Sequence, residues 1–281
     1  MVTDYLSLSL GEFACLILQD RIDYVSLQVA FPDVDAADLA SVGTEGEDIP
    51  FPYICLYIDT GTHKVLIDTG NGSARGGSVV AKLDAAGITP DQIDTVVLTH
   101  AHSDHYGGLL DTDGSRQYPN AEVVMARGEW EFYSSAGYLE SLQSENSQLY
   151  EYLVRSLLEM EPYIRLVDDG EEVVRGIRVM AAPGHTVHHI ALEIQSAGKT
   201  LLNIGDAWIH PVSVERPEWR FFRDADNGVA AQTRHTLAQK AANGGAMVLG
   251  YHFPFPGLVR ISDVNGAYHC EAWHLKADDE D

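Results

Sequence analysis

Short apolar runs separated by polar turns recur along most of the chain, and this pattern predicts a framework of β-strands. Residues 54–58 and 64–68 are expected to form a hairpin around Gly61, and residues 258–262 and 267–275 a closing hairpin. Between the two hairpins the pattern predicts strands at 95–99, 163–167, 171–174, 177–182, 188–194, 199–206 and 246–252. Residues 121–133 are expected to form a strand followed by the start of a helix. The first fifty residues mix short apolar stretches with turns and indicate no chemistry.

Longer helices are expected in three places. Residues 78–87 have helical apolar spacing and a glycine that stops the helix. In the short turn that follows, Thr89 is expected to form a capping box with Gln92, three residues later, and Pro90 takes the first helical position. A second helix is expected over about 229–242. Residues 138–161 are polar and helix-prone, with leucines at helical intervals, and are expected to form an insertion that serves as a lid or as a homodimer contact. We therefore predict an α+β protein with one domain over residues 1–281 and two mostly antiparallel sheets.

Charge argues against one class of partner. The 281 residues include 18 Lys and Arg against 42 Asp and Glu, and the acidic residues are spread along most of the chain. No basic stripe interrupts them, so nucleic acid is not expected as a partner. No long uncharged apolar run of bilayer-spanning length is present either, so no membrane partner is expected.

The cysteines and the N-terminus indicate the compartment. Cys15, Cys55 and Cys270 are odd in number and widely scattered, which argues against a disulfide framework and favours a reducing environment. Pairing of two of the three remains an alternative. No basic residue precedes the first apolar positions, so the N-terminus does not have the pattern of a signal peptide. A cytoplasmic protein is expected.

The segment LTHAHSDHYGG, residues 98–108, is the clearest candidate for chemistry. His100 and His102 lie two apart in an extended stretch, so their rings point the same way. Asp104 and His105 come after the chain begins to turn and can face a neighbouring point. Imidazole with carboxylate is a ligand set that suits zinc, and also cobalt, manganese or iron. The alternative is a polar loop with solvated histidines.

Three later segments supply what a second metal would need. His185 lies at a glycine-bearing turn after a strand, Asp206 at the end of another strand, and His252 at the end of a third. Sites on β scaffolds are usually built where strands run out into loops. His189 and His210 are near enough in sequence to these residues to be candidates for contacts with the ligands.

The order of these motifs resembles that of the metallo-β-lactamase superfamily. The matching segments are IDTG with Asp68, then THAHSDH, PGHT, GDAW and GYHF, and the resemblance covers the chain from about residue 53 to the end. It implies a four-layer αββα sandwich with the site along one edge of the two packed sheets. It also implies that Asp68 orients the ligand loop without binding metal.

The resemblance further implies how the ligands divide between two divalent ions, with zinc expected first. One ion is held by His100, His102 and His185, the other by Asp104, His105 and His252, and Asp206 bridges both. A hydroxide shared by the ions would attack the substrate C=O or P=O, with Asp104 or Asp206 assisting proton movement. This is hydrolysis without a covalent enzyme intermediate.

Details of the motifs narrow the substrate. The runs GDAWIH and GGAMVLGYHFPFPG are most similar to the branch of methyl parathion hydrolases and acyl-homoserine lactonases, although the tyrosine that lactonases carry after the bridging aspartate is missing. A small ester or lactone is therefore expected first, with a phosphotriester or a glyoxalase II-type thioester as alternatives, and a metal-dependent sensor or scaffold as the non-enzyme alternative. An apolar leaving-group pocket is expected from Trp208, Phe221, Phe222, Tyr251, Phe253 and Phe255, each of which has a core position as its alternative.

Overall fold

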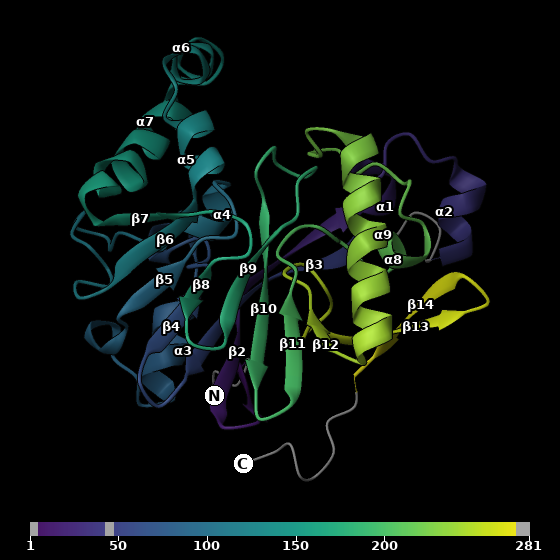
Figure 1. Ribbon diagram of the computed structural model, residues 1–281. Coiled ribbons are helices and arrows are strands. Elements are labelled where there is room, and N and C mark those ends of the chain that lie inside the picture. Colours follow the sequence, from purple (N-terminus) through teal and green to yellow (C-terminus); the bar gives the residue numbers. More distant parts are fainter. Residues whose placement is uncertain (1–4, 43–47, 274–281) are drawn as a thin grey trace.

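The computed structural model describes residues 5–42 and 48–273, which fold around two seven-stranded sheets (Figure 1). The first sheet contains, in spatial order, β1 (Tyr5–Leu10), β2 (Phe13–Ser26), β3 (Asp48–Asp59), β4 (Lys64–Ile67), β5 (Thr95–Val97), β6 (Glu122–Ala126) and β7 (Ile164–Val167). The second contains, in spatial order, β14 (Ala267–Ala272), β13 (Leu258–Val264), β12 (Met247–Leu249), β11 (Lys199–Asn203), β10 (Ile190–Ser196), β9 (Ile177–Ala181) and β8 (Glu172–Val174).

Strand direction departs from the sequence-based prediction in the first sheet. Strands β1 to β4 pair antiparallel, whereas β4 to β7 pair parallel. The prediction of a mostly antiparallel arrangement is therefore wrong for half of this sheet. The reason is that β5, β6 and β7 are each reached through a helical crossover, as parallel pairing requires. The second sheet is antiparallel except between β11 and β12, which are joined through helices.

Helices cover the outer faces of both sheets. They are α1 (Leu27–Ala30), α2 (Ala36–Val42), α3 (Val79–Ala85), α4 (Ser103–Tyr106), α5 (Arg127–Tyr133), α6 (Ala136–Glu145), α7 (Ser147–Ser156), α8 (Val212–Glu215) and α9 (Asn227–Gly244), with the 3₁₀ turns η1 (Ser73–Arg75), η2 (Pro90–Gln92) and η3 (Leu158–Tyr163). Helices α3 and α5 contact the first sheet, α6 packs on α5 and α7 and extends away from that sheet, and α9 lies against β13 and β14 of the second sheet (Figure 1). Within residues 5–42 and 48–273, no helix has the length and apolar character to cross a membrane.

Three buried apolar layers hold this arrangement together. The central one lies between the sheets and joins residues such as Leu56 and Ile67 of the first sheet to Leu192 and Ile194 of the second. A second cluster packs the first sheet against α3 to α7, and a third packs the second sheet against α9. Alternate residues of each strand thus face different layers, which is the αββα sandwich that the sequence predicts.

Local signals account for most elements, with two differences. The helical segment expected over 138–161 is split into α6, α7 and η3, because the Asn146 side chain accepts the Leu149 N–H and starts a new helix. The first fifty residues, for which no element was expected, form the β1–β2 hairpin and two short helices. The predicted capping box of Thr89 and Gln92 is confirmed. Residues 274–275 of the expected closing strand lie outside the described residues.

Candidate metal centre

Four loops carry the seven candidate ligands, and each loop follows the end of a strand. His100 to His105 follow β5, His185 lies between β9 and β10, Asp206 follows β11, and His252 follows β12. Because β5 belongs to the first sheet and the other three strands to the second, the ligands come together only when the two sheets pack. They form two groups of donor atoms, and within each group all donor atoms lie within 4.8 Å of one another.

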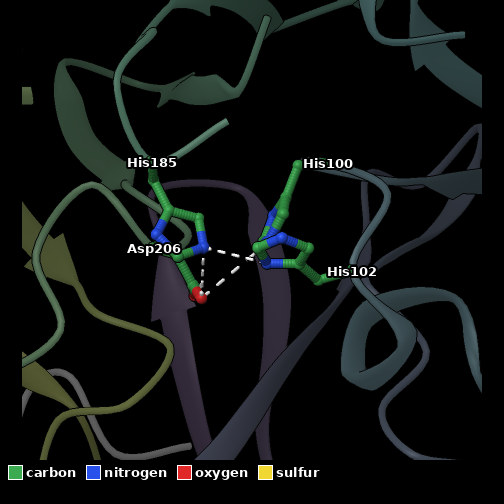
Figure 2. Close-up of side chains that lie close together, drawn as sticks. All are labelled: His100, His102, His185 and Asp206. Atoms are coloured by element: carbon green, nitrogen blue, oxygen red, sulfur yellow. Dashed lines mark hydrogen bonds and ion pairs between the residues drawn. The ribbon is translucent and has the colours of Figure 1, made fainter. Parts of the chain in front are cut away.

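The first group consists of His100, His102, His185 and Asp206 (Figure 2). The Nε2 atom of His185 lies 3.0 Å from Nδ1 of His102 and 3.3 Å from Oδ2 of Asp206. His100 Nε2 lies 3.9 Å from the same carboxylate oxygen. Three imidazoles and a carboxylate therefore point at one small volume.

The second group consists of Asp104, His105, Asp206 and His252. His105 Nε2 lies 3.4 Å from Oδ1 of Asp206 and 3.6 Å from Oδ2 of Asp104. His252 Nε2 lies 3.2 Å from Oδ2 of Asp206 and 3.7 Å from Asp104. Asp206 belongs to both groups, with one oxygen close to His105 and the other close to His185 and His252.

Several of these donor atoms have no hydrogen-bond partner among the described residues, as expected for atoms that bind a metal ion. Nε2 of His100, Nε2 of His105 and Oδ1 of Asp206 are buried and accept or donate no hydrogen bond among the described residues. A buried polar atom without a partner costs about 1–3 kcal/mol, so three such atoms facing one another need an explanation. Imidazole nitrogen and carboxylate oxygen are ligands that zinc prefers. The residues therefore fit two divalent ions.

Hydrogen bonds at the Nδ1 atoms hold two of the imidazoles in place. His105 Nδ1 lies 2.9 Å from Oδ2 of Asp68, and His252 Nδ1 donates to the carbonyl of Pro52 at 2.9 Å. Asp68 also accepts the Thr99 backbone N–H, so it fixes the start of the histidine loop as well. These bonds turn the Nε2 atoms toward the centre, as partners of metal-binding histidines do.

Burial and neighbouring groups set the protonation states of three candidate ligands, His100, His102 and Asp206. Burial lowers the pKa of His100 and of His102 well below the ordinary value, and the neighbouring imidazoles act in the same direction. Both rings are therefore neutral at pH 7 and offer a lone pair. For Asp206, burial acts to raise the pKa, but His252 and His105 hold it well below the ordinary value. The shared carboxylate is thus ionised.

Comparison with known proteins identifies the family. The model of the metallo-beta-lactamase superfamily matches residues 49–252. The chain belongs to this superfamily. It is 26% identical over 195 residues to an N-acyl homoserine lactonase of a Bacillus species, covering 61% of this chain and 70% of the relative. A hydroxyacylglutathione hydrolase of Photobacterium profundum is 28% identical over 159 residues, covering 54% of this chain and 48% of that protein.

Solved structures of the metallo-beta-lactamase fold are similar over almost the whole chain. AidC, a dizinc quorum-quenching lactonase, has a TM-score of 0.87 at 23% identity and covers 97% of this chain and 98% of its own. The hydrolase AbOPH has a TM-score of 0.88 at 25% identity and covers 98% and 99%. With the two groups of metal-binding side chains, this membership makes the chain a metal-dependent hydrolase.

A cavity of about 410 Å³ opens onto the two groups of candidate ligands. His102, Asp104, Asp206 and His252 line its floor. Its apolar wall comes from the helices α5 to α7, through Tyr133, Tyr138, Leu142, Leu149 and Leu153. Three of the leucines at helical intervals, Leu142, Leu149 and Leu153, thus line the cavity. These helices therefore form one wall of the cavity.

The aromatic residues expected at the pocket lie in different places in the structure. Phe221 and Phe222 line the cavity. Trp208 and Phe253 do not, because both are fully buried in the apolar cluster between the second sheet and α9. Tyr251 lies behind the ligands: its ring stacks on His105 at 3.9 Å and its hydroxyl donates to the Asp104 carbonyl. Phe255 is partly exposed and does not line the cavity either.

The two histidines expected to contact ligands differ in outcome. His189 is buried and its Nε2 accepts the backbone N–H of Asp206 at 3.1 Å, while its Nδ1 donates to the Ala182 carbonyl. His210 makes a local bond instead: its Nδ1 accepts the Val212 N–H at the start of α8. His210 therefore stabilises its own turn, and its described hydrogen bond does not reach a ligand.

Three residues of the centre were missed from the sequence. The Asp224 carboxylate lies 3.4 Å from His185 Nδ1 and is paired with Arg234, and both side chains are fully buried. Glu129 contacts the loops on both sides of the first group. No local spacing signals these contacts, because their partners are 28 to 57 residues away for Glu129 and 39 for Asp224.

Proposed function

We propose that this protein is a dinuclear metal-dependent hydrolase that cleaves a small ester or lactone. One observation carries the proposal: two groups of metal-binding side chains share Asp206, and their accessible members line one cavity with an apolar wall. The similarity to an N-acyl homoserine lactonase of a Bacillus species supports a lactone or ester over other bonds.

The residues divide between two ions, with zinc as the metal we propose. His100, His102 and His185 would hold one ion, Asp104, His105 and His252 the other, and Asp206 both. When bound, two such ions supply a hydroxide nucleophile at neutral pH and polarise the scissile carbonyl.

Between the two carboxylates, Asp104 is the better proton carrier. Its side chain is 24% exposed and lines the cavity, so it can reach both the substrate and solvent. The Asp206 side chain is 3% exposed and has histidine nitrogens on both oxygens. We propose that Asp104 takes up a proton from solvent in the cavity and delivers it to the departing alkoxide, while Asp206 keeps the two groups at a constant separation.

The cavity wall favours a substrate with an apolar part. Leucine and tyrosine side chains of α5 to α7 exclude water from one side, and Phe221 and Phe222 from another. Arg75 and Arg223 line the same cavity and provide hydrogen-bond donors for polar groups of the substrate. A lactone or ester with an acyl or aryl chain would place its apolar chain against the apolar wall and its polar groups near Arg75 and Arg223.

The test combines metal content with a substrate panel. Wild-type protein is analysed for bound metals and assayed with p-nitrophenyl acetate, an acyl-homoserine lactone and paraoxon. The variant Asp206→Ala is measured beside Asp84→Ala, which removes an exposed carboxylate on α3. We expect about two metals per chain, hydrolysis of the ester or lactone, and loss of both metal and activity only in Asp206→Ala.

Other outcomes choose between the alternatives. If the protein hydrolyses paraoxon faster than the ester and the lactone, its substrate class is a phosphotriester and not an ester or lactone. Two bound metals without turnover of any substrate would favour a sensor or scaffold. Wild-type protein that binds no metal would contradict the proposal as a whole.

A further inference from the structure

Glu129 is a buried carboxylate behind the metal centre. It lies in α5, directly after β6, and is 1% exposed. Its Oε1 accepts the backbone N–H of Ala101 at 2.9 Å, and its Oε2 accepts the hydroxyl of Thr186 at 2.9 Å. Burying a carboxylate is costly unless it is hydrogen-bonded, and these donors satisfy both oxygens.

The partners of Glu129 lie between or beside metal-binding residues. Ala101 separates His100 from His102, and Thr186 directly follows His185. One carboxylate therefore connects the backbone of the histidine loop after β5 with the loop between β9 and β10, although the two loops extend from different sheets.

The approach of α5 to the second loop is close. A Cβ atom added to Gly128 would lie 2.5 Å from Nδ1 of His188. Glycine at this position lets the start of the helix come near enough for Glu129 to reach Thr186. The carboxylate is thus held at the junction from one side by its helix and from the other by two donors, the Ala101 N–H and the Thr186 hydroxyl.

The second group of ligands is held by other atoms. Asp68 contacts His105, and the carbonyl of Pro52 contacts His252, each at 2.9 Å. Neither of these two contacts involves Glu129, and neither the Ala101 nor the Thr186 bond contacts the second group. The described hydrogen bonds of Glu129 therefore act on the first group of ligands.

We propose that Glu129 is a positioning residue that sets the spacing of His100, His102 and His185, so that its loss weakens binding of one metal ion and spares the other. This inference rests on the proposed dinuclear centre. Replacing the carboxylate by a carboxamide keeps its size but turns an N–H₂ group toward one of the donors, so one of the two loops is released.

The experiment measures metal binding directly. Metal-free protein is titrated with Zn²⁺ against a chromophoric chelator, which gives the number of ions and both dissociation constants. The variants are Glu129→Gln, Thr186→Val and their combination. Thr186→Ser keeps the hydroxyl, and Glu131→Gln changes an exposed carboxylate of the same helix. The absorption spectrum of Co²⁺-loaded protein reports the ligand geometry independently.

We expect one dissociation constant to rise about 10–100-fold in Glu129→Gln, which is the usual effect of removing a partner of a metal ligand. The other constant should stay within about threefold, and the Co²⁺ spectrum should change. Thr186→Val should have a smaller effect that does not add to that of Glu129→Gln, because both break the same link. Thr186→Ser and Glu131→Gln should behave like the wild type.

Two results would overturn the inference. In the first, Glu129→Gln and Thr186→Val bind both ions as the wild type does; the dinuclear centre would then stand and only the role of Glu129 would fall. In the second, Glu129→Gln weakens both ions equally and lowers the melting temperature of metal-free protein to match, which would make Glu129 a residue of general stability. Wild-type protein that binds no Zn²⁺ would refute the proposed function together with this inference.

Discussion

The buried pair of Arg234 and Asp224 gives a prediction whose size follows from its contacts. Arg234 lies in α9 and its Nη2 donates to Oδ2 of Asp224 at 2.6 Å, with both side chains at 0% exposure. Its Nε donates to the Ala207 carbonyl at 2.9 Å, and its Nη1 to the carbonyls of Pro217 and Trp219 at 3.0 Å. The guanidinium therefore connects α9 to the segment that carries Asp206 and to the segment that carries Asp224.

Arg234→Leu keeps an apolar stem but leaves the Asp224 carboxylate without its cation. Removing one partner of a buried ion pair costs about 3–5 kcal/mol, because the remaining charge is not compensated. We expect the free energy of unfolding to fall by about this amount. The loss would be a large part of the total, since a typical protein has a free energy of unfolding of ~5–15 kcal/mol. Asp224→Asn combined with Arg234→Leu should recover part of the loss, since it removes the buried charge.

Urea denaturation of metal-free protein, followed by tryptophan fluorescence, measures these differences without a contribution from metal binding. Arg216→Leu, at an exposed arginine that follows α8, is the matched control and should change the free energy of unfolding by less than about 0.5 kcal/mol. A loss below about 1 kcal/mol for Arg234→Leu would refute the reasoning. So would a double variant that is no more stable than Arg234→Leu alone, because the cost would then not come from the charge.

Three further predictions concern pH, the ligand loop and the cavity. Burial lowers the pKa of His210 to about 4 in the folded protein. As the pH falls, this side chain therefore takes up a proton in the unfolded chain before it does so in the folded protein. Between pH 7 and pH 5 the wild type should therefore lose about 2 kcal/mol more unfolding free energy than His210→Gln, measured by urea titration at both values. Gly72→Ala should lower the melting temperature and the metal content, because its Cβ would overlap the Gly107 carbonyl oxygen. Leu142→Ala, in the cavity wall, should lower kcat/KM for p-nitrophenyl octanoate about 5–30-fold, since about 1–2 kcal/mol of apolar contact is lost, and should leave p-nitrophenyl acetate unchanged.

Each of the three predictions has a control variant or an outcome that would contradict it. Equal pH dependence in His210→Gln and the wild type would mean that His210 is not buried neutral in solution. Gly76→Ala also forces a positive φ, 81°, but meets no atom within 4 Å, so it should cost only the backbone strain of about 1 kcal/mol. An equal loss in both glycine variants would contradict the close approach at Gly72. Equal losses with the long and the short ester in Leu142→Ala would contradict its place in the cavity wall.

Local pattern in the sequence was enough for the strands after β2, for the long helix α9 and for the ligand loops, but not for β1 and β2. Alternating or continuous apolar runs mark where strands lie, and the histidines and aspartates sit where those runs end. The spacing of His100 and His102 already puts both rings on one side of an extended segment. The division of ligands between two ions was carried by the resemblance to a family and not by the spacing.

Tertiary structure decided what lies at a distance along the chain. Whether Trp208 and Phe253 face the cavity or α9 depends on how each loop turns after its strand, which no periodicity records. Parallel pairing of β4 to β7 depends on the crossovers between them. The sequence predicts helices near residue 142, and the structure places side chains of these helices in the wall of the cavity.

The partners of the ligands are the clearest case. Glu129, Asp224 and Arg234 are charged residues in polar segments, and nothing in their neighbours distinguishes them from solvated ones. Their carboxylates and guanidinium become buried only when the two sheets and α9 pack, and each then meets donors or acceptors that lie 10 to 57 residues away. The sequence by itself determined which side chains could bind metal and at which strand ends they lie. The packing of the sheets determined that they meet and which buried groups hold them, because hydrogen bonds between distant segments depend on position in space and not on spacing along the chain.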